Sequence, residues 1–330
     1  MKAKLGILAA LSVALIVTFM VIQSGGNWDY VLPKRGVKIA AIVLTGGSIA
    51  LSTMVFQTIT NNRILTPSIL GLDSLYLLMQ TFVVFAFGAS TLTMMSKHSH
   101  FLLSIGLMVL FSGVLYKLVF KREGRNIYFL LLIGIIFGTL FTSFTSFMQV
   151  LIDPNEFMIV QDRMFASFNR MNTDLLWLAI LLLALTTAYF TKFAKYLDVL
   201  SLGRDHAVNL GIDYDHVVKR LLIVVAILVS VSTALVGPIT FLGLLVANVA
   251  HEFLRTYRHR YLILGSTLIS IIALVGGQLL VERVFTFSTT ISVMINLVGG
   301  IYFIYLLLKE NKKSGRSQEG FETVRKQSRR

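Results

Sequence analysis

Long apolar stretches alternate with short polar segments along most of this 330-residue chain. About 20 apolar residues suffice to cross a bilayer as a helix, and ten stretches approach or reach that length. Their apolar runs are continuous rather than alternating, which favours helices over the strands of a β-barrel. The expected spans are residues 5–23, 37–59, 70–89, 101–119, 127–150, 174–193, 217–236, 238–254, 261–281 and 290–308.

Composition supports a membrane protein. The chain is 55% hydrophobic and only 14% charged, with a mean hydropathy of +0.77, whereas soluble domains carry about 25% charged residues. We therefore predict an all-α polytopic membrane protein with about ten transmembrane helices, formed by residues 1–308. Residues 309–330 are polar and basic and lack periodicity, which predicts a disordered cytoplasmic tail.

The net charge of +14 is distributed unevenly between the expected loops. If the N-terminus is cytoplasmic, 23 Lys and Arg residues fall in cytoplasmic segments and 7 in outer ones. This asymmetry follows the positive-inside rule and predicts that both termini are cytoplasmic. The excess charge is then a topology signal with some attraction to anionic lipid, and nucleic-acid binding is not needed to explain it.

The sequence lacks the usual signatures of catalysis and of an energy source. It has no G-x-x-x-x-G-K-[ST] motif for ATP and no cysteine. His251-Glu252 begins like a zinc-protease helix, but position 255 is Arg, so no metal or catalytic site is expected. Proton-driven carriers usually place acidic or His residues at mid-membrane, and Asp73 is a rare candidate here. A partner that supplies energy is favoured, with a self-contained secondary carrier or channel as the alternative.

One polar segment, about residues 198–216, separates two apolar spans and has the composition of short helices. Gly203 and Gly211 predict helix boundaries. The segment either docks on a partner in the water or lies on lipid as an interfacial amphipathic helix. Its apolar edge is predicted to consist of Leu200, Leu202, Ala207 and Leu210, with Arg204, Asp205 and His206 as a polar rim.

Four motifs in fixed order resemble the permease subunits of iron-siderophore and vitamin B12 ABC importers, the FecCD or type II importers. The family patterns are Q-x-x-x-x-N-P-L-A-x-P-x-x-L-G, L-x-L-G-x-x-x-A-x-x-L-G, G-P-I-x-F-x-G-L and G-x-P-x-F-x-x-L-L. The corresponding stretches are QTITNNRILTPSILG at 57–71, LSLGRDHAVNLG at 200–211, GPITFLGL at 237–244 and GGIYFIYLL at 299–307.

The chain departs from this family pattern at several positions. Arg63 follows Asn62 where the family has proline, Ala247-Asn248 replace the usual Pro-His, and Ile301 replaces the last proline. These departures are similar to those of the permease subgroup that handles siderophores of the petrobactin and anguibactin kind. The resemblance implies a permease that moves a ferric siderophore across the bacterial cytoplasmic membrane.

The resemblance also implies partners and an assignment for the polar segment. The expected partners are a second permease subunit, the same or homologous, a cytoplasmic ATPase dimer and an extracellular substrate-binding lipoprotein. No cofactor is expected in this chain, because ATP and Mg²⁺ would be bound by the ATPase. The residues expected to couple the permease to the ATPase are Leu200, Gly203, Arg204, Ala207, Leu210 and Gly211.

Two further sets of site residues follow from the resemblance. Arg35, Lys38 and, more weakly, Arg283 would contact the binding lipoprotein, with simple interface anchors at helix ends as the alternative for Arg35 and Lys38. The polar groups of the translocation pathway would come from several spans, although ordinary hydrogen bonding between helices explains each of them as well. These expected pathway residues are Gln57, Ser143, Thr145, Ser146 and Gln149.

Overall fold

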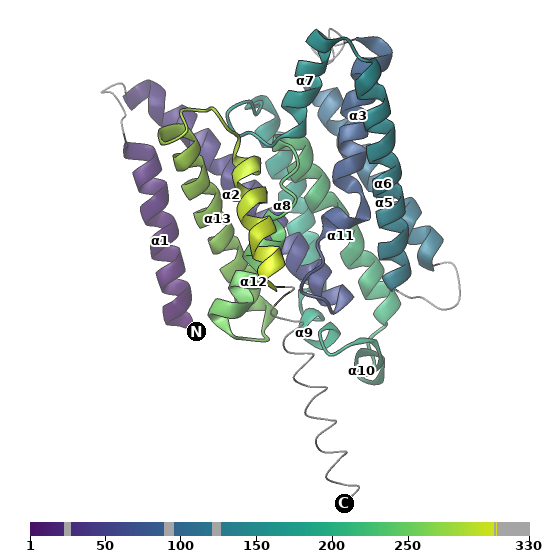
Figure 1. The fold of residues 1–330 in the computed structure, drawn as a ribbon. Helices are drawn as coiled ribbons and strands as arrows, with labels where there is room; N and C mark the ends of the chain where they lie inside the picture. The colour runs from purple at the N-terminus through teal and green to yellow at the C-terminus, as the bar shows by residue number, and fades with distance from the viewer. Residues whose placement is uncertain (23–27, 89–95, 121–126, 307, 309–330) are drawn as a thin grey trace, which may run out of the picture.

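The computed structural model describes residues 1–22, 28–88, 96–120, 127–306 and 308, and within these ranges every regular element is a helix. The proposed tail, residues 309–330, lies outside the described part. The helices are α1 (Lys2–Val21), α2 (Trp28–Thr60), η1 (Pro67–Leu70), α3 (Leu72–Phe87), α5 (Lys97–Phe120), α6 (Ile127–Leu151), α7 (Pro154–Met164), α8 (Asp174–Ala194), α9 (Leu197–Leu200), α10 (Arg204–Asn209), α11 (Tyr214–Val236), α12 (Leu242–Leu254), α13 (His259–Arg283) and a final helix, Ile291–Leu306 (Figure 1).

The prediction of an all-helical membrane protein is confirmed. Seven described helices are long and apolar enough to cross a membrane, namely α1, α2, α5, α6, α8, α11 and α13. The apolar helices α3, α12 and Ile291–Leu306 are shorter. Together these helices fall on the ten spans expected from the apolar pattern.

The shorter helices coincide with the Gly and Pro breaks in the sequence. Gly71 has φ +81°, and a Cβ there would lie 3.0 Å from the backbone of Gly138 on α6. Gly237 has φ +98°, and its Cβ would lie 2.9 Å from the Cα of Ala166. Only glycine combines a left-handed backbone with such close approach. The two breaks therefore bring η1 against α6, and the segment after α11 against the loop that follows α7.

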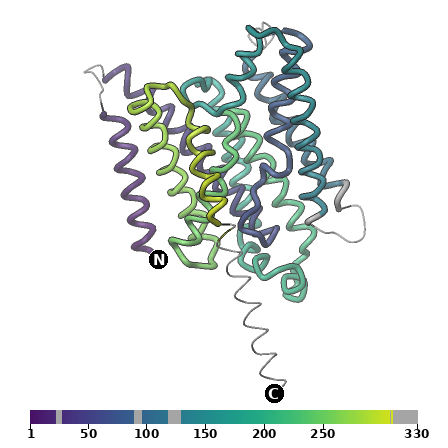
Figure 2. Tube along the Cα trace, in the orientation of Figure 1, coloured from purple at the N-terminus to yellow at the C-terminus, as the bar shows by residue number. Residues whose placement is uncertain are grey.

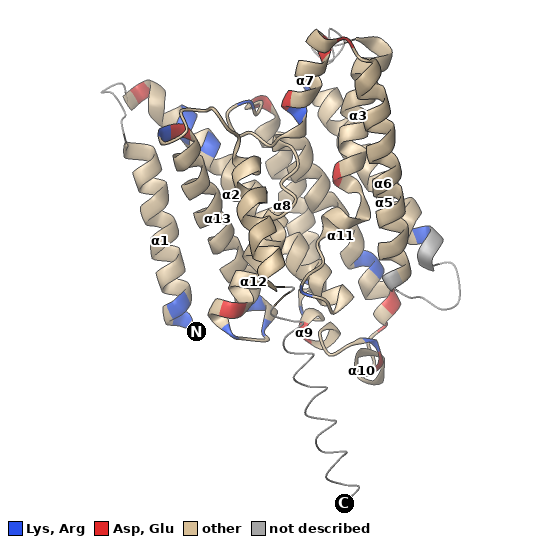
Figure 3. Ribbon diagram, viewed as in Figure 1, with Lys and Arg blue, Asp and Glu red and all other residues tan. Residues whose placement is uncertain are grey.

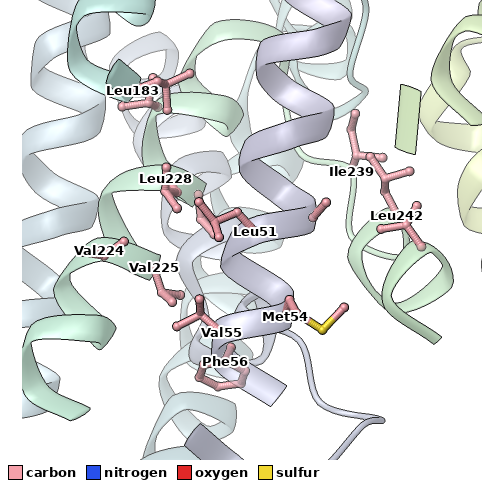
Figure 4. Close-up of a cluster of buried hydrophobic side chains, with 14 of the residues drawn as sticks. Leu51, Met54, Val55, Phe56, Leu183, Val224, Val225, Leu228, Ile239 and Leu242 are labelled. Atoms are coloured by element: carbon pink, nitrogen blue, oxygen red, sulfur yellow. The ribbon is translucent and has the colours of Figure 1, made fainter. Parts of the chain in front are cut away.

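The core is built around α2 and α11, which are largely buried, while α1 and α6 keep most of their surface exposed. α2 packs against α11, α12 and α13, and α11 packs also against α5 and α8. Figure 4 shows part of this core, where side chains of α2, α8, α11 and the start of α12 point toward one another. The labelled residues include Leu51, Val55, Leu183, Val225 and Leu242.

The helices run roughly side by side between two polar faces. The N-terminus lies at the same face as α9 and α10, and α7 lies at the opposite face (Figures 1 and 2). Lys4 Nζ donates a hydrogen bond to the carbonyl oxygen of Phe253 at 2.6 Å, which joins the start of α1 to the end of α12 at that face. Charged residues gather mainly at the two faces (Figure 3). By the positive-inside rule, the face with α9 and α10 is cytoplasmic.

Candidate functional site: the polar loop and the two membrane faces

The segment after α8 forms the two short helices α9 and α10, which we call the coupling loop (residues 197–216). Gly203, with φ +97°, precedes α10, and Gly211, with φ +81°, follows it. A Cβ at either glycine would meet nothing within 4 Å. Both positions therefore need glycine for the backbone conformation rather than for space.

The apolar residues of the coupling loop divide into an inner and an outer set. Leu200 and Ala207 have no exposed surface and hold the loop against the helices. Leu202, Val208 and Leu210 are 57%, 50% and 64% exposed. Sequence reasoning placed Leu200 and Ala207 on the same outward edge as Leu210 and did not single out Val208. The surface available to a partner is therefore Leu202, Val208 and Leu210.

Contacts of Arg204 and Tyr214 attach the second half of the loop to the helices. Arg204 Nη2 lies 3.7 Å from Asp215 Oδ2, and its guanidinium carbon is 6.0 Å from the centre of the Tyr214 ring. The Tyr214 hydroxyl donates to the carbonyl oxygen of Ile59, in the last turn of α2, at 3.5 Å. Asp213 caps α11 by accepting from His216 N at 3.1 Å. The loop therefore continues into α11 through a defined cap.

The first half of the loop is attached through Asp198. One carboxylate oxygen, Oδ1, accepts from the backbone N–H of His259 at 2.9 Å and lies 2.7 Å from its Nδ1. The other ring nitrogen, Nε2, lies 2.8 Å from Thr58 Oγ1 on α2. Partial burial alone would raise the pKa of Asp198, but the hydrogen bonds from His259, with the charges of His259 and Arg258, outweigh it and lower that pKa.

A cavity of about 660 Å³ lies between the coupling loop and the cytoplasmic ends of α2, α12 and α13. Gln57 lines it and donates through Nε2 to the carbonyl oxygen of Arg63 at 2.5 Å, as does Asn248 Nδ2 at 2.9 Å. Gln57 is thus placed at the cytoplasmic face, apart from the other expected pathway residues. Over the part of the chain that the structure describes, no three His, Cys, Asp or Glu side chains group as metal ligands.

Ser143 and Ser146 line a groove of about 500 Å³ between η1, α3 and α6. Thr139 and Thr142, which sequence reasoning missed, line it too, and their helical i, i+3, i+4, i+7 spacing with the serines is the signal that could have revealed them. Ser68 and Ser74 contribute from the opposite wall, and Thr142 Oγ1 donates to Ser74 Oγ at 3.3 Å. Four hydroxyl groups thus lie exposed on one face of a membrane helix.

The remaining two expected pathway residues lie elsewhere on α6. Thr145 is buried, and its hydroxyl donates to the Phe141 carbonyl oxygen at 2.8 Å. Gln149 Nε2 lies 3.6 Å from Met164 Sδ at the end of α7. The five expected pathway residues therefore fall into four places: the cytoplasmic cavity, the hydroxyl-lined groove, the helix interior at Thr145 and the contact of α6 with α7 at Gln149.

The three outer cations come from distant parts of the chain and gather at one corner of the outer face. Arg35 Nη1 donates to the carbonyl oxygens of Phe19, Met20 and Ile22 at 2.8–2.9 Å, at the C-terminal end of α1. Arg283 Nη2 donates to the Ile22 carbonyl oxygen at 3.2 Å. Each of these guanidinium groups is thus bonded within the chain.

Lys38, the third cation, forms an ion pair between α2 and α13. Its Nζ lies 2.9 Å from Glu282 Oε1, and the side chains are 25% and 9% exposed. Glu282 also accepts from Gln278 Nε2 at 2.8 Å. The charged side chains at this corner therefore make contacts within the chain.

A solved structure and several curated proteins are similar to this chain. An inward-facing metal-chelate type ABC transporter superposes with a TM-score of 0.80 at 23% identity, covering 93% of this chain and 99% of that one. The petrobactin import system permease protein YclO of Bacillus subtilis is 69% identical over 311 residues, which is 94% of this chain and 98% of YclO. The petrobactin import system permease protein FatC of Bacillus anthracis is 39% identical over 280 residues, 85% of this chain and 79% of FatC.

The model of the FecCD transport family matches residues 5–309. This range covers the ten spans, the coupling loop and all four motifs on which the resemblance rested. The resemblance is thereby confirmed, as is the prediction of a multi-pass permease of the cytoplasmic membrane that leaves ATP hydrolysis to a separate subunit. The chain belongs to the FecCD transport family and is a permease subunit of an ABC importer.

Proposed function

We propose that this chain is a permease subunit for import of a ferric siderophore of the petrobactin type. The observation that carries the proposal is the 69% identity with YclO across 98% of that protein. Similarity to hydroxamate permeases is much lower, at 28% for FhuG of Bacillus subtilis. Family membership disfavours the alternative class, a self-contained carrier, which predicts transport by this chain without an ATPase.

We further propose that the second permease subunit is a different, homologous chain. Bacillus subtilis has two proteins named as petrobactin import permeases, YclO and YclN, to which this chain is 69% and 24% identical. Bacillus anthracis likewise has FatC and FatD, at 39% and 25% identity. The same contrast in both organisms supports a heterodimer in which this chain takes the place of YclO or FatC.

The substrate would pass along the hydroxyl-lined groove of α6, closed on its open side by the second subunit. The hydroxyls of Thr139, Thr142 and Ser143 each donate to a carbonyl oxygen four residues earlier on α6, so their protons are satisfied within the helix. Their oxygens, with the Ser146 hydroxyl, still face the groove as acceptors, and a water-filled passage rather than lipid suits a face with four hydroxyls. Gln57 would act at the cytoplasmic end of the passage, whereas Thr145 is proposed to stabilise α6 rather than to contact substrate.

The coupling loop is proposed to dock on the cytoplasmic ATPase dimer, which would bind ATP and Mg²⁺. Leu202, Val208 and Leu210 would supply the apolar contact, and Arg204 would border it. Buried apolar anchors surrounded by polar residues are typical of protein interfaces. An interfacial helix on lipid would instead place all three apolar side chains toward the bilayer.

On the outer face, Arg35, Lys38 and Arg283 remain the proposed contact for the substrate-binding lipoprotein. Their clustering at one corner supports the proposal, since local positive charge steers an acidic partner. Because each cation is already hydrogen-bonded within the chain, it would attract the lipoprotein through its charge while keeping its internal bonds.

The proposal is tested by reconstituting the permease pair with its ATPase and binding protein in liposomes and measuring uptake of radiolabelled ferric petrobactin. We expect uptake to require ATP and to exceed that of a ferric hydroxamate. Leu210→Asp should release the ATPase and abolish uptake, while the control Leu210→Met should not. Transport by this chain alone, or preference for the hydroxamate, would contradict the proposal.

A further inference from the structure

We propose that Asp198, His259 and Thr58 are positioning residues that transmit movement of the coupling loop to α13 and α2. The inference rests on the proposed role of that loop as the ATPase contact. It concerns the inner side of the loop, opposite the exposed leucines. The three side chains form one continuous line of hydrogen bonds from α9, through the first residue of α13, to the last turn of α2.

Asp198 acts as the N-terminal cap of α13, although it belongs to a different helix. Arg258, at the cap position, makes no side-chain cap bond, whereas the Asp198 carboxylate accepts the first N–H of the helix at 2.9 Å. A carboxylate at this end also interacts favourably with the helix dipole. Displacement of α9 would therefore either pull the start of α13 with it or break the cap.

His259 extends the connection to α2. Its side chain is 7% exposed, and it lies between Asp198 and Thr58 with contacts of 2.7 and 2.8 Å. A carboxylate can only accept hydrogen bonds, so Nδ1 carries a proton. Thr58 Oγ1 also lies 2.8 Å from the Met54 carbonyl oxygen. Its single proton is donated either to that carbonyl, in which case His259 Nε2–H donates to Oγ1, or to an unprotonated Nε2. The side chain of His259 thus fixes the distance between the loop and two core helices.

A second connection starts at the other end of the loop and reaches the same turn of α2. Tyr214, next to Asp215 and its partner Arg204, donates to the carbonyl oxygen of Ile59 at 3.5 Å. The two connections therefore converge on adjacent residues, Thr58 and Ile59. A loop held at both ends to one turn would displace that turn as a unit rather than slide past it.

The converging turn leads directly into the segment that borders the groove. After Thr60 the chain passes through Asn61, which has φ +48°, a left-handed conformation that asparagine adopts more readily than most residues. Gln57 and Asn248 hold the carbonyl oxygen of Arg63, and η1 follows at Pro67, packed against α6. Short contacts thus join the coupling loop to the end of α2, and the end of α2 to η1 and the hydroxyl-lined groove.

Substitutions that keep the shape of the side chain can remove one hydrogen bond of this series at a time. Thr58→Val keeps the side-chain shape and removes the hydroxyl. His259→Asn keeps a donor near the Nδ1 position toward Asp198 but loses the contact with Thr58. Thr186→Val is a matched control, because Thr186 is also buried and, among the residues that the structure describes, its hydroxyl bonds only the Leu182 carbonyl oxygen of its own helix.

The natural absence of cysteine allows a direct readout of the groove. Ser143→Cys introduces a single thiol, and its rate of reaction with a water-soluble maleimide is measured in the reconstituted complex with and without ATP and vanadate. We expect ATP to change this rate in the parent and in Thr186→Val. In Thr58→Val and His259→Asn, the ATP-induced change in the labelling rate should be at least about fivefold smaller than in the parent, because fivefold is the lower end of typical coupling between sites. The ATPase should still co-purify with both variants.

Two outcomes would overturn the inference: an undiminished ATP response in Thr58→Val, or a parent complex without any ATP response at Ser143→Cys. The double variant Thr58→Val/His259→Asn should be no worse than either single variant, because both remove the same contact. Additive losses would also count against a shared line. Labelling needs no siderophore, so failure of petrobactin uptake with an intact labelling response would refute the proposed substrate and not this connection.

Discussion

Helices α2 and α13 lie side by side and are bonded to each other at both membrane faces, but in different ways. At the outer face Lys38 and Glu282 form a direct ion pair of 2.9 Å. At the inner face Thr58 bonds to His259, which in turn bonds to Asp198 on the coupling loop. The outer pair joins the two helices directly, with Gln278 linking Glu282 to Asn169 in the loop after α7, whereas the inner contact passes through His259 to the coupling loop. Similar polar residues thus hold a fixed contact at one end and connect to a partner-facing loop at the other.

This difference shows that charge at a membrane face does not by itself identify a docking site. Arg35, Lys38 and Arg283 gather as a partner-binding patch would, yet each is bonded within the chain. Leu202, Val208 and Leu210 carry no charge, yet they are the exposed apolar residues of a loop held tightly from within. Burial and hydrogen bonding separate the two cases, and neither is visible in residue type alone.

The largest effect on stability is expected at the outer pair. Lys38→Met leaves Glu282, 9% exposed, without its cation. Breaking a fully buried pair costs about 3–5 kcal/mol, and because Lys38 is 25% exposed we expect about 2 kcal/mol. Thermal unfolding in detergent measures it, and the exchange Lys38→Glu/Glu282→Lys should recover part of the loss.

The same variants separate an internal from an external role. If the pair is only structural, the exchanged variant should bind the lipoprotein as the parent does. If Lys38 contacts an acidic residue of the lipoprotein, the exchange should restore stability but weaken binding at low salt, where charge steering is strongest.

A smaller effect is expected from Asp198→Ala at the inner face. Loss of the cap of α13 should lower the free energy of unfolding by about 1 kcal/mol, typical of helix caps. Unlike Lys38→Met, it should also reduce the ATP response of the Ser143→Cys label. Asp198→Asn, which keeps an acceptor oxygen, serves as the control and should lose less of both. An equal loss of ATP response in Lys38→Met would remove the distinction between the two faces.

Much of the fold followed from the sequence because apolar length and Lys/Arg asymmetry are strong constraints in a bilayer. The ten expected spans correspond to helices, and Gly203 and Gly211 bound α10 as predicted. The inward orientation of Leu200 and Ala207 could not be read from their type, because both sides of a short loop carry apolar residues. It depends on packing against segments distant in the chain.

The site was harder to predict for the same reason. Thr58 and His259 are 201 residues apart, and Asp198 is 61 residues from His259. No local spacing connects them, so only tertiary structure reveals the line. Thr139 and Thr142 could have been found, since they share one helix face with Ser143 and Ser146.

An effect on stability no larger than that of Asp198→Ala is expected at Arg35. Arg35→Met removes the donors to three carbonyl oxygens at the end of α1, and Arg35→Lys keeps the charge but not the planar fork. We expect about 1 kcal/mol for Met and less for Lys. Cross-linking of paired cysteines in α1 and α13 would report whether α1 has loosened. An unchanged cross-linking rate in Arg35→Met would show that packing alone holds α1.

The smallest effect is expected from pH, and it distinguishes the inner face once more. The pKa of Asp198 is lowered in the folded protein, so its contribution to stability is present above the unfolded value of about 3.9 and is lost as pH falls through the lower folded value. The difference in melting temperature between the parent and Asp198→Asn should therefore shrink as pH falls below about 4. If it shrank already between pH 7 and 5, the charge of Asp198 would not be the source of the difference, because a carboxylate with a lowered pKa stays ionised throughout that range.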